Sequence, residues 1–346
     1  MKINFVGDIG LFKTFEDLQI DPFNETILPD SNLNIGNFEF VIPDNRTKAY
    51  YDVQEKYSCS YDYLKKLRID KFHGFGLANN HSLDYGLEGA LDTITSIKNA
   101  GIQVFGFSND MNYSLGKFEA EGIKVGIIGC VKKGRWSKEI YGYGPDSYYT
   151  NLIVDLIRKN RNDFDHLVVY PHWGKELISV PDIQDTESAK AFIDAGASAV
   201  IGHHPHVPQG VERYKHGFIA YSLGSFIYVH EDELGYSKRL TKRHISICVT
   251  IDFSARDITA FSCHYYQYNQ KTRIPEMVDS ESMRVYANYL NDNIYNNKLY
   301  RQEIRRILFV REVISFWERF KSSPIKTIAN YIIITVSLVK KRIFNK

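Results

Sequence analysis

The chain has few cysteines and no cluster of them. Its four thiols, at positions 59, 130, 248 and 263, show no C-x-x-C spacing, so neither a zinc knuckle nor a disulfide scaffold is indicated. The N-terminus also lacks the apolar stretch and the small-residue cleavage site that are typical of a secretory leader. From these absences we expect a cytoplasmic protein.

Long apolar runs and internal repeats are absent as well. The most apolar stretch, residues 325–339, is shorter than the ~20 residues of a membrane-spanning helix and contains Lys326. It is more typical of an amphipathic helix that rests on a membrane or on the protein itself. From Lys298 onward, twelve Lys and Arg stand against three Glu, a net charge of +9, whereas the rest of the chain carries −7. This asymmetry predicts an anionic polymer or the inner face of a membrane near the tail, and we expect no nucleic-acid partner.

Apolar periodicity predicts an alternation of strands and helices in the first two thirds of the chain. The predicted strands cover residues 3–6, 33–40, 72–78, 102–107, 125–131, 166–170 and 197–201, and the predicted helices cover 61–67, 87–100, 151–161 and 186–195. Such alternation is typical of an α/β sheet with helices on its faces. Residues 210–228 and 244–268 add antiparallel strands, and the chain turns helical from residue 280. We therefore expect one domain over 1–275 and a basic helical extension over 276–346.

Three imidazoles follow the last of these alternating strands, in the sequence Gly202-His203-His204-Pro205-His206. Because Pro205 disfavours the helical region for the residue before it, we expect His204 and His206 on an extended backbone, pointing toward one bound object. A surface loop that happens to be rich in histidine is the alternative. Neutral imidazole is the commonest protein ligand for a transition metal, which favours a metal site.

Other strands end in residues of the same kind. The set is Asp8, Asn37, Glu39, Asn79, Asn80, His81, His172, His203, His204 and His206. A mixture of carboxylates, amides and imidazoles suits Mn²⁺, Zn²⁺ or Fe, and argues against a calcium cage or a thiolate zinc site. His81 lies three residues before Asp84, a spacing that lets the carboxylate orient the ring as a general acid. The alternative for Asn79, Asn80 and Asp84 is that they form and cap the turn before the next helix.

Six motifs, taken in order, resemble those of the CapA family of bacterial poly-γ-glutamate capsule synthesis proteins, whose fold is similar to that of the calcineurin-like metallophosphoesterases. They are Gly7-Asp8, Asn37-Phe38-Glu39, residues 78–86, His172-Trp173-Gly174-Lys175-Glu176, residues 202–209 and residues 221–226. The resemblance covers residues 1–230. It implies a four-layer sandwich of two mixed β-sheets flanked by helices, with a site for one or two divalent ions at the strand ends.

The resemblance also implies roles for single residues. The implied metal ligands are Asp8, Glu39, Asn80, His172, His204 and His206, and His81 is implied as the catalytic acid. The residues expected to contact substrate are Asn37, Asn79, Trp173, Glu176, His203 and Gln209. The alternative for His203 is that it supports the metal ligands, and the alternative for Trp173 is that it packs in the core. The chain departs from the pattern at Gly10, where the wider group has a histidine, at Asn37, where that group tends to carry a bridging aspartate, and at Ser225, where an asparagine is usual.

The residues predict a metal-dependent, phosphoesterase-like hydrolase that acts on a phosphorylated substrate, and the resemblance implies that it acts in capsule or exopolymer synthesis. Two alternatives stay open. One is a non-catalytic subunit that binds an anionic polymer in its cleft and docks on a membrane or a synthesis complex through its basic tail. The departures at Gly10 and Asn37 favour this alternative. The other is a metal-dependent hydrolase of γ-glutamyl amides. The loops at 44–60, 132–150 and 229–243 match no motif, so the substrate cannot be assigned from sequence.

Overall fold

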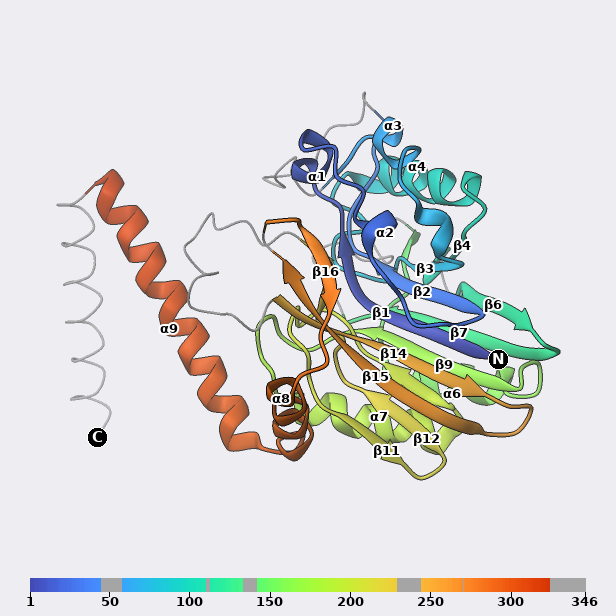
Figure 1. Ribbon diagram of the computed structural model, residues 1–346. Helices are drawn as coiled ribbons and strands as arrows, with labels where there is room; N and C mark the ends of the chain where they lie inside the picture. The colour runs from blue at the N-terminus through green and yellow to red at the C-terminus, as the bar shows by residue number, and fades with distance from the viewer. Residues whose placement is uncertain (45–57, 110–112, 133–141, 229–243, 270, 324–346) are drawn as a thin grey trace.

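The computed structural model describes residues 1–44, 58–109, 113–132, 142–228, 244–269 and 271–323 (Figure 1). Its larger sheet has eight strands in the order β16-β15-β14-β1-β2-β3-β4, with β13 paired to the end of β1. Strands β1 to β4 are parallel, whereas β14, β15 and β16 run antiparallel to their neighbours. The bounds are β1 (Lys2–Gly10), β2 (Leu33–Phe38), β3 (Gly74–Gly76), β4 (Gln103–Phe105), β13 (Ser225–Tyr228), β14 (Ile245–Phe253), β15 (Ile258–Asn269) and β16 (Ile274–Met277).

The second sheet has six strands in the order β11-β12-β10-β9-β7-β6 and is also mixed. Its strands are β6 (Leu115–Ala120), β7 (Ile123–Val131), β9 (His166–His172), β10 (Ala199–Ile201), β11 (Val211–Tyr214) and β12 (Gly217–Ala220). A separate antiparallel pair joins β5 (Phe107–Asn109) to β8 (Tyr143–Pro145). Both sheets therefore combine parallel and antiparallel strands.

Three apolar cores hold four layers together. Phe5 and Val249 of the first sheet pack between the sheets against Val168 and Phe218 of the second. The outer face of the second sheet is covered by α6 (Thr150–Asn160) and α7 (Ile183–Ala195). The outer face of the first sheet is covered by α3 (Tyr61–Leu64) and α4 (Gly86–Asn99), and Figure 1 shows these two helix layers on opposite sides of the sheets. The predicted four-layer sandwich is confirmed.

The remaining helices are short or lie after the sandwich. They are α1 (Lys13–Asp17), α2 (Pro22–Glu25), the 3₁₀ turn η2 (Ile69–Lys71), α8 (Glu281–Asp292) and α9 (Asn297–Ser322). Helix α9 leaves α8 and lies to one side of the sandwich (Figure 1). Within the part of the chain that the structure describes, no helix combines the length and apolar character needed to cross a membrane.

Glycines mark two of the connections between these elements. Glu121-Gly122 joins β6 to β7 as a hairpin, and Gly196 ends α7 with a left-handed φ of 115°. Strand β16 is added to the first sheet after a gap at residue 270, so the sheet extends to Met277. The membrane-surface segment 325–339 and most of the three unassigned loops, at 45–57, 133–141 and 229–243, lie outside the described residues.

Candidate metal centre

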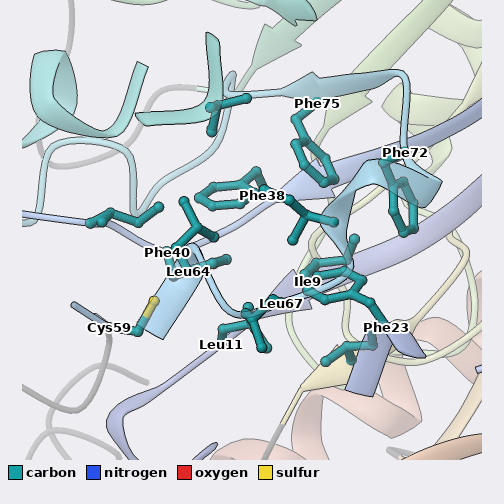
Figure 2. Packing of buried hydrophobic residues seen from close by; sticks show 14 of the residues in the cluster. Ile9, Leu11, Phe23, Phe38, Phe40, Cys59, Leu64, Leu67, Phe72 and Phe75 are labelled. Carbon is teal, nitrogen blue, oxygen red and sulfur yellow. The ribbon is translucent and has the colours of Figure 1, made fainter. Parts of the chain in front are cut away.

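The polar side chains gather where parallel strands end. Asp8 of β1 lies beside Asn37 of β2 in register, and His172, the last residue of β9, forms a bridge to His203 after β10. Glu39 follows β2. The side chains of Phe38 and Phe40, on either side of it in sequence, stack with ring centroids 4.0 Å apart inside the apolar core (Figure 2). Because successive side chains of an extended chain point to opposite sides, this packing directs Asn37 and Glu39 away from that core.

Asp8 is fully buried, and both of its carboxylate oxygens contact amide or imidazole nitrogens. Its Oδ1 accepts a hydrogen bond from Asn37 Nδ2 at 2.8 Å and lies 3.3 Å from His203 Nδ1. Its Oδ2 lies 3.1 Å from His206 Nδ1. Burial alone would raise the pKa of Asp8, but the contacts with His203 and His206 outweigh it and hold that pKa well below its usual value. Asp8 is therefore an anion.

Glu39 is fully buried but lacks such support. Neither carboxylate oxygen has a hydrogen-bond partner among the described residues. Its Oε1 lies 3.5 Å from His172 Nε2 and 3.6 Å from His206 Nε2. Burial, and then the negative charges of Asp8 and Glu176, raise the pKa of Glu39 well above its usual value. An ionised carboxylate in this position requires a positive charge beside it.

Two of the surrounding imidazoles, those of His172 and His204, do not supply that charge. Burial, and then the neighbouring His204, lower the pKa of His172 well below its usual value. Burial, and then His206, lower the pKa of His204 to about 4. The rings of His172 and His204 lie 4.7 Å apart. Two neutral imidazoles therefore lie beside two buried carboxylates.

Two groups of these side chains have the spacing of a metal site. In the first, Glu39, His204 and His206 each offer a ligand atom within 4.8 Å of the others, and in the second Asp8, Glu39 and His172 do so. The Oδ1 atom of Asn80 lies 2.6 Å from His172 Nε2 and adds an amide oxygen. An orphaned buried carboxylate with neutral imidazoles around it fits a divalent transition metal, because the cation would balance the carboxylate charge and accept the imidazole lone pairs. The six predicted ligands are thus brought together.

His81 lies at the edge of this group with its carboxylate partner. Its Nδ1 contacts Asp84 Oδ2 at 2.6 Å, and its Nε2 lies 4.0 Å from Glu39 Oε1. The side chain of His81 is 19% exposed, whereas that of Asp84 is nearly buried. Asp84 therefore fixes the ring so that the other nitrogen faces the cluster. The catalytic role of the pair stays a prediction.

The backbone of the histidine loop is not extended as predicted. His204 and His206 have φ of 96° and 57°, in the region that residues other than glycine occupy at a cost of about 1–3 kcal/mol. Hydrogen bonds from Leu177 N to the Pro205 carbonyl at 2.7 Å and from His204 N to Asp8 Oδ2 at 3.3 Å hold this shape. The local preference is overridden by contacts with two other segments, and both rings still reach Glu39.

Three of the predicted substrate contacts are buried and hydrogen-bonded within the protein. Trp173 is buried and donates to the Tyr221 carbonyl at 2.9 Å, and Gln209 donates to the Ile178 carbonyl at 2.9 Å. Asn79 donates to the Phe38 carbonyl at 2.8 Å and its Oδ1 accepts from Ser82, so it holds the turn before α4. All three are at most 2% exposed and bond to other parts of the protein, so substrate contact by them stays a prediction.

Asn37 and His203 lie beneath the cluster, and for His203 this agrees with the alternative that it supports the ligands. Both are 1% exposed and contact Asp8 directly. Asn37 Nδ2 lies 3.3 Å from His172 Nδ1 as well, so it orients one carboxylate and one imidazole. These two residues position the implied ligands rather than face the opening. Among the predicted substrate contacts, Glu176 remains partly exposed and lines a cavity beside His204.

Sequence reasoning missed the aromatic rings that support the imidazoles. Tyr170 lies 4.1 Å from the ring of His203, and Tyr228 lies 4.6 Å from that of His206. Ser225, noted only as a departure, lies with Oγ 3.2 Å from His206 Nδ1. Tyr170 lies in a predicted strand two residues before His172, so alternation along that strand was the signal that could have identified it.

Comparison with known families identifies the chain. The family described as "Bacterial capsule synthesis protein PGA_cap" matches residues 2–229. The chain belongs to this family. The matched span contains every residue of the candidate metal centre, and it excludes α8 and α9.

Two similar proteins carry related names. The "PGA biosynthesis protein CapA" of Bacillus subtilis is 27% identical over 242 residues, which cover 66% of this chain and 63% of that protein. The "Capsule biosynthesis protein CapA" of Bacillus anthracis is 31% identical over 211 residues, which cover 58% of this chain and 51% of that protein. The chain thus matches between half and two thirds of the length of these relatives.

The solved structures that resemble this chain are less similar to it in sequence than the two Bacillus proteins. A putative 5'-nucleotidase from Staphylococcus aureus has a TM-score of 0.48 and 16% identity, covering 84% of this chain and 58% of that one. A phosphatase from Mycoplasma pneumoniae has a TM-score of 0.45 and 14% identity, covering 82% and 96%. Similarity at this level carries no information about activity.

Proposed function

We propose that this chain is a metal-dependent phosphoester hydrolase that acts in the synthesis of a bacterial capsule or another exopolymer. The observation that carries the proposal is Glu39, a buried carboxylate without a hydrogen-bond partner among the described residues, between His172 and His206. Membership of the capsule synthesis family supports the biological setting, and the names of the two Bacillus relatives agree with it.

The proposed ion is Mn, Fe or Zn, held by side chains from both candidate groups. Glu39 belongs to both groups, so the donor set suits one ion or two. When bound, such an ion polarises a phosphoryl oxygen and lowers the pKa of a water molecule that attacks phosphorus. Asn37 contributes by holding Asp8 and His172 in place through its amide group.

The proton needed by the leaving group comes from His81 in this proposal. Asp84 contacts its Nδ1 at 2.6 Å, which orients the ring toward the cluster. The Nε2 atom then faces the cluster and donates its proton to the departing oxygen. General acid catalysis of this kind contributes about 10²–10⁴-fold to the rate.

The test compares two phosphodiesters with different leaving groups, methyl p-nitrophenyl phosphate and dimethyl phosphate, with protein supplied with Mn²⁺. His206→Ala is expected to lose activity on every substrate. His81→Ala is expected to lose about 10²–10⁴-fold where the leaving group is methanol, but little where it is p-nitrophenolate, which departs without a proton. Full activity of both variants, or equal losses of His81→Ala on both substrates, would contradict the mechanism.

A second candidate is a non-catalytic subunit that binds an anionic surface or polymer, and α9 favours it. Arg301, Arg305 and Arg306 are exposed on this helix together with Phe309, which is 67% exposed. Basic and apolar side chains on one exposed helix are typical of segments that bind the surface of an anionic membrane. A wild-type protein that binds metal and vesicles, yet cleaves neither phosphoesters nor γ-glutamyl amides, would favour this candidate. Cleavage of a γ-glutamyl amide alone would favour the amide hydrolase.

A further inference from the structure

Helix α9 is fixed against the loop that follows His172. The Glu303 carboxylate accepts hydrogen bonds from Ser179 N at 2.7 Å and from Ser179 Oγ at 2.6 Å. Tyr300 donates its hydroxyl to Asp182 Oδ2 at 2.6 Å. One turn further along the helix, Ile307 is buried against Leu177, Ile178 and Val207. The first half of α9 is therefore a docked part of the molecule.

This docking forms one wall of an open cavity of about 300 Å³ next to the candidate metal centre. One wall is formed by Ile304, Ile307 and Leu308 of α9. The opposite side is formed by Gly174, Lys175, Glu176, Ile178 and His204. His204 also belongs to a group of candidate ligands with Glu39 and His206. The cavity and the candidate metal centre thus share His204, and the far wall of the cavity comes from residues outside the span that matches the family.

The lining of the cavity restricts what can occupy it. Four of its eight residues are aliphatic, and its two oppositely charged side chains, Lys175 and Glu176, balance each other. A polyanion would require a clear excess of positive charge, which this lining lacks. A volume of about 300 Å³ is at the lower end of the range for small-molecule sites. The cavity suits an uncharged, apolar group of moderate size.

We propose that this cavity receives an apolar group of the substrate while the phosphoryl group lies at the metal centre. The inference rests on the proposed function, because it assumes a phosphoester at that centre. Ile304 and Leu308 are then specificity residues: they favour phosphoesters with an aryl or branched alkyl substituent over those with a methyl group. The C-terminal extension would in this way give the chain a substrate preference that the family span alone does not provide.

The test measures binding without hydrolysis. Isothermal titration of the full chain, supplied with Mn²⁺, compares phenylphosphonate with methylphosphonate, which share the anionic group and differ only in the apolar one. The wild type is expected to bind phenylphosphonate about tenfold more tightly or better. Leu308→Ala and Ile304→Ala are each expected to reduce that ratio by about three- to tenfold. Leu308 is 59% exposed, so its truncation leaves the fold intact.

Phe309→Ala is the matched control, since Phe309 is the next residue on the same helix, is 67% exposed and does not line the cavity. It should keep the wild-type ratio. Equal binding of the two phosphonates by the wild type, no binding of either, or an unchanged ratio in both cavity variants would overturn the inference, even if the hydrolysis assay succeeds. An intact preference in a protein that hydrolyses no phosphoester would instead refute the proposed function and leave the cavity assigned.

Discussion

Glu39 is the residue whose surroundings need the most explanation. Burying a carboxylate without partners costs several kcal/mol if it stays ionised, and here Asp8 adds a second buried negative charge nearby. Asp8 is compensated by Asn37, His203 and His206, but Glu39 faces His172 and His206 without a hydrogen bond from either. The arrangement is costly for a metal-free protein and favourable for one that holds a cation.

The raised pKa of Glu39 gives a prediction about stability and pH in protein treated with a chelator. The folded chain keeps the Glu39 proton to a higher pH than the unfolded chain, whose glutamate pKa is about 4.3. The folded state therefore binds more protons above that pH, and this group lowers the free energy of unfolding as pH rises.

Glu39→Gln lacks this penalty, so its stability relative to the chelated wild type should increase between pH 5 and pH 7.5. Urea denaturation at several pH values measures the difference, in which the contributions of the other titrating groups largely cancel. Glu119→Gln, at an exposed position of β6, is the control and should show no such trend. A constant difference for Glu39→Gln across this range would contradict the account.

At the level of single residues, sequence could identify the members of the cluster but not the direction of every side chain. Asp8, Glu39, Asn80 and the histidines are chemically distinctive and follow apolar strands, so they can be recognised. Trp173 and Gln209 lie in the same motifs, but their polar atoms bond to carbonyls of distant segments. Those contacts depend on tertiary structure, which local pattern does not reveal.

Among the elements, the end of β1 depends on a close backbone contact. Asp8 N donates to the Gly224 carbonyl at 2.9 Å, and a Cβ on Gly7 would lie 2.0 Å from that same carbonyl oxygen. The contact brings β1 against the start of β13, which places Asp8 beside Ser225. The glycine of the first motif is therefore required by packing, and it helps to position a candidate ligand.

Gly7→Ala should consequently destabilise the fold by about 3 kcal/mol or more, because backbone atoms rather than a flexible side chain must move. Gly122→Ala is the comparison, since a Cβ there meets nothing within 4 Å and the only strain comes from its φ of 73°, at about 1–2 kcal/mol. Chemical denaturation measures both. A Gly7 variant no less stable than the Gly122 variant would contradict the argument.

The longer elements could be predicted because each combines a clear period with a stop signal. Helix α7, for example, ends at Ala195, the last residue of the predicted helix, and Gly196 caps it. The elements that sequence missed are short, such as α1, α2 and the pair β5 and β8, and segments of three to five residues carry too little periodicity to be recognised. The backbone of His204 and His206 was predicted wrongly because contacts from Leu177 and Asp8 override the local preference.

At the scale of the whole molecule, one side of α9 packs beside the candidate site and the other side faces solvent. One side of it docks through Tyr300, Glu303 and Ile307, while Arg301, Arg305 and Arg306 remain exposed. No sequence pattern indicated that this helix would line a cavity at the metal centre, because the contact joins segments more than a hundred residues apart.

If α9 rests on an anionic membrane, the charge of its exposed side should control binding. The triple variant Arg301→Glu, Arg305→Glu and Arg306→Glu is expected to bind vesicles containing phosphatidylserine roughly a hundredfold more weakly, at about 1 kcal/mol for each basic residue. Flotation at low salt measures this. The control reverses three exposed charges at the C-terminal end of α6: Arg158 and Lys159 of the helix and Arg161, its C-cap. This variant should keep wild-type binding, and equal losses in both variants would argue against a specific role of α9.

The central claim is that side chains from five separate segments form one site for a divalent ion. The most direct test is elemental analysis of protein purified without a histidine tag, together with Glu39→Gln. We expect one or two equivalents of Mn, Fe or Zn in the wild type and a clear loss in the variant, whose fold is retained. A wild-type protein that contains none of these metals, and takes up none on dialysis against them, would contradict the claim.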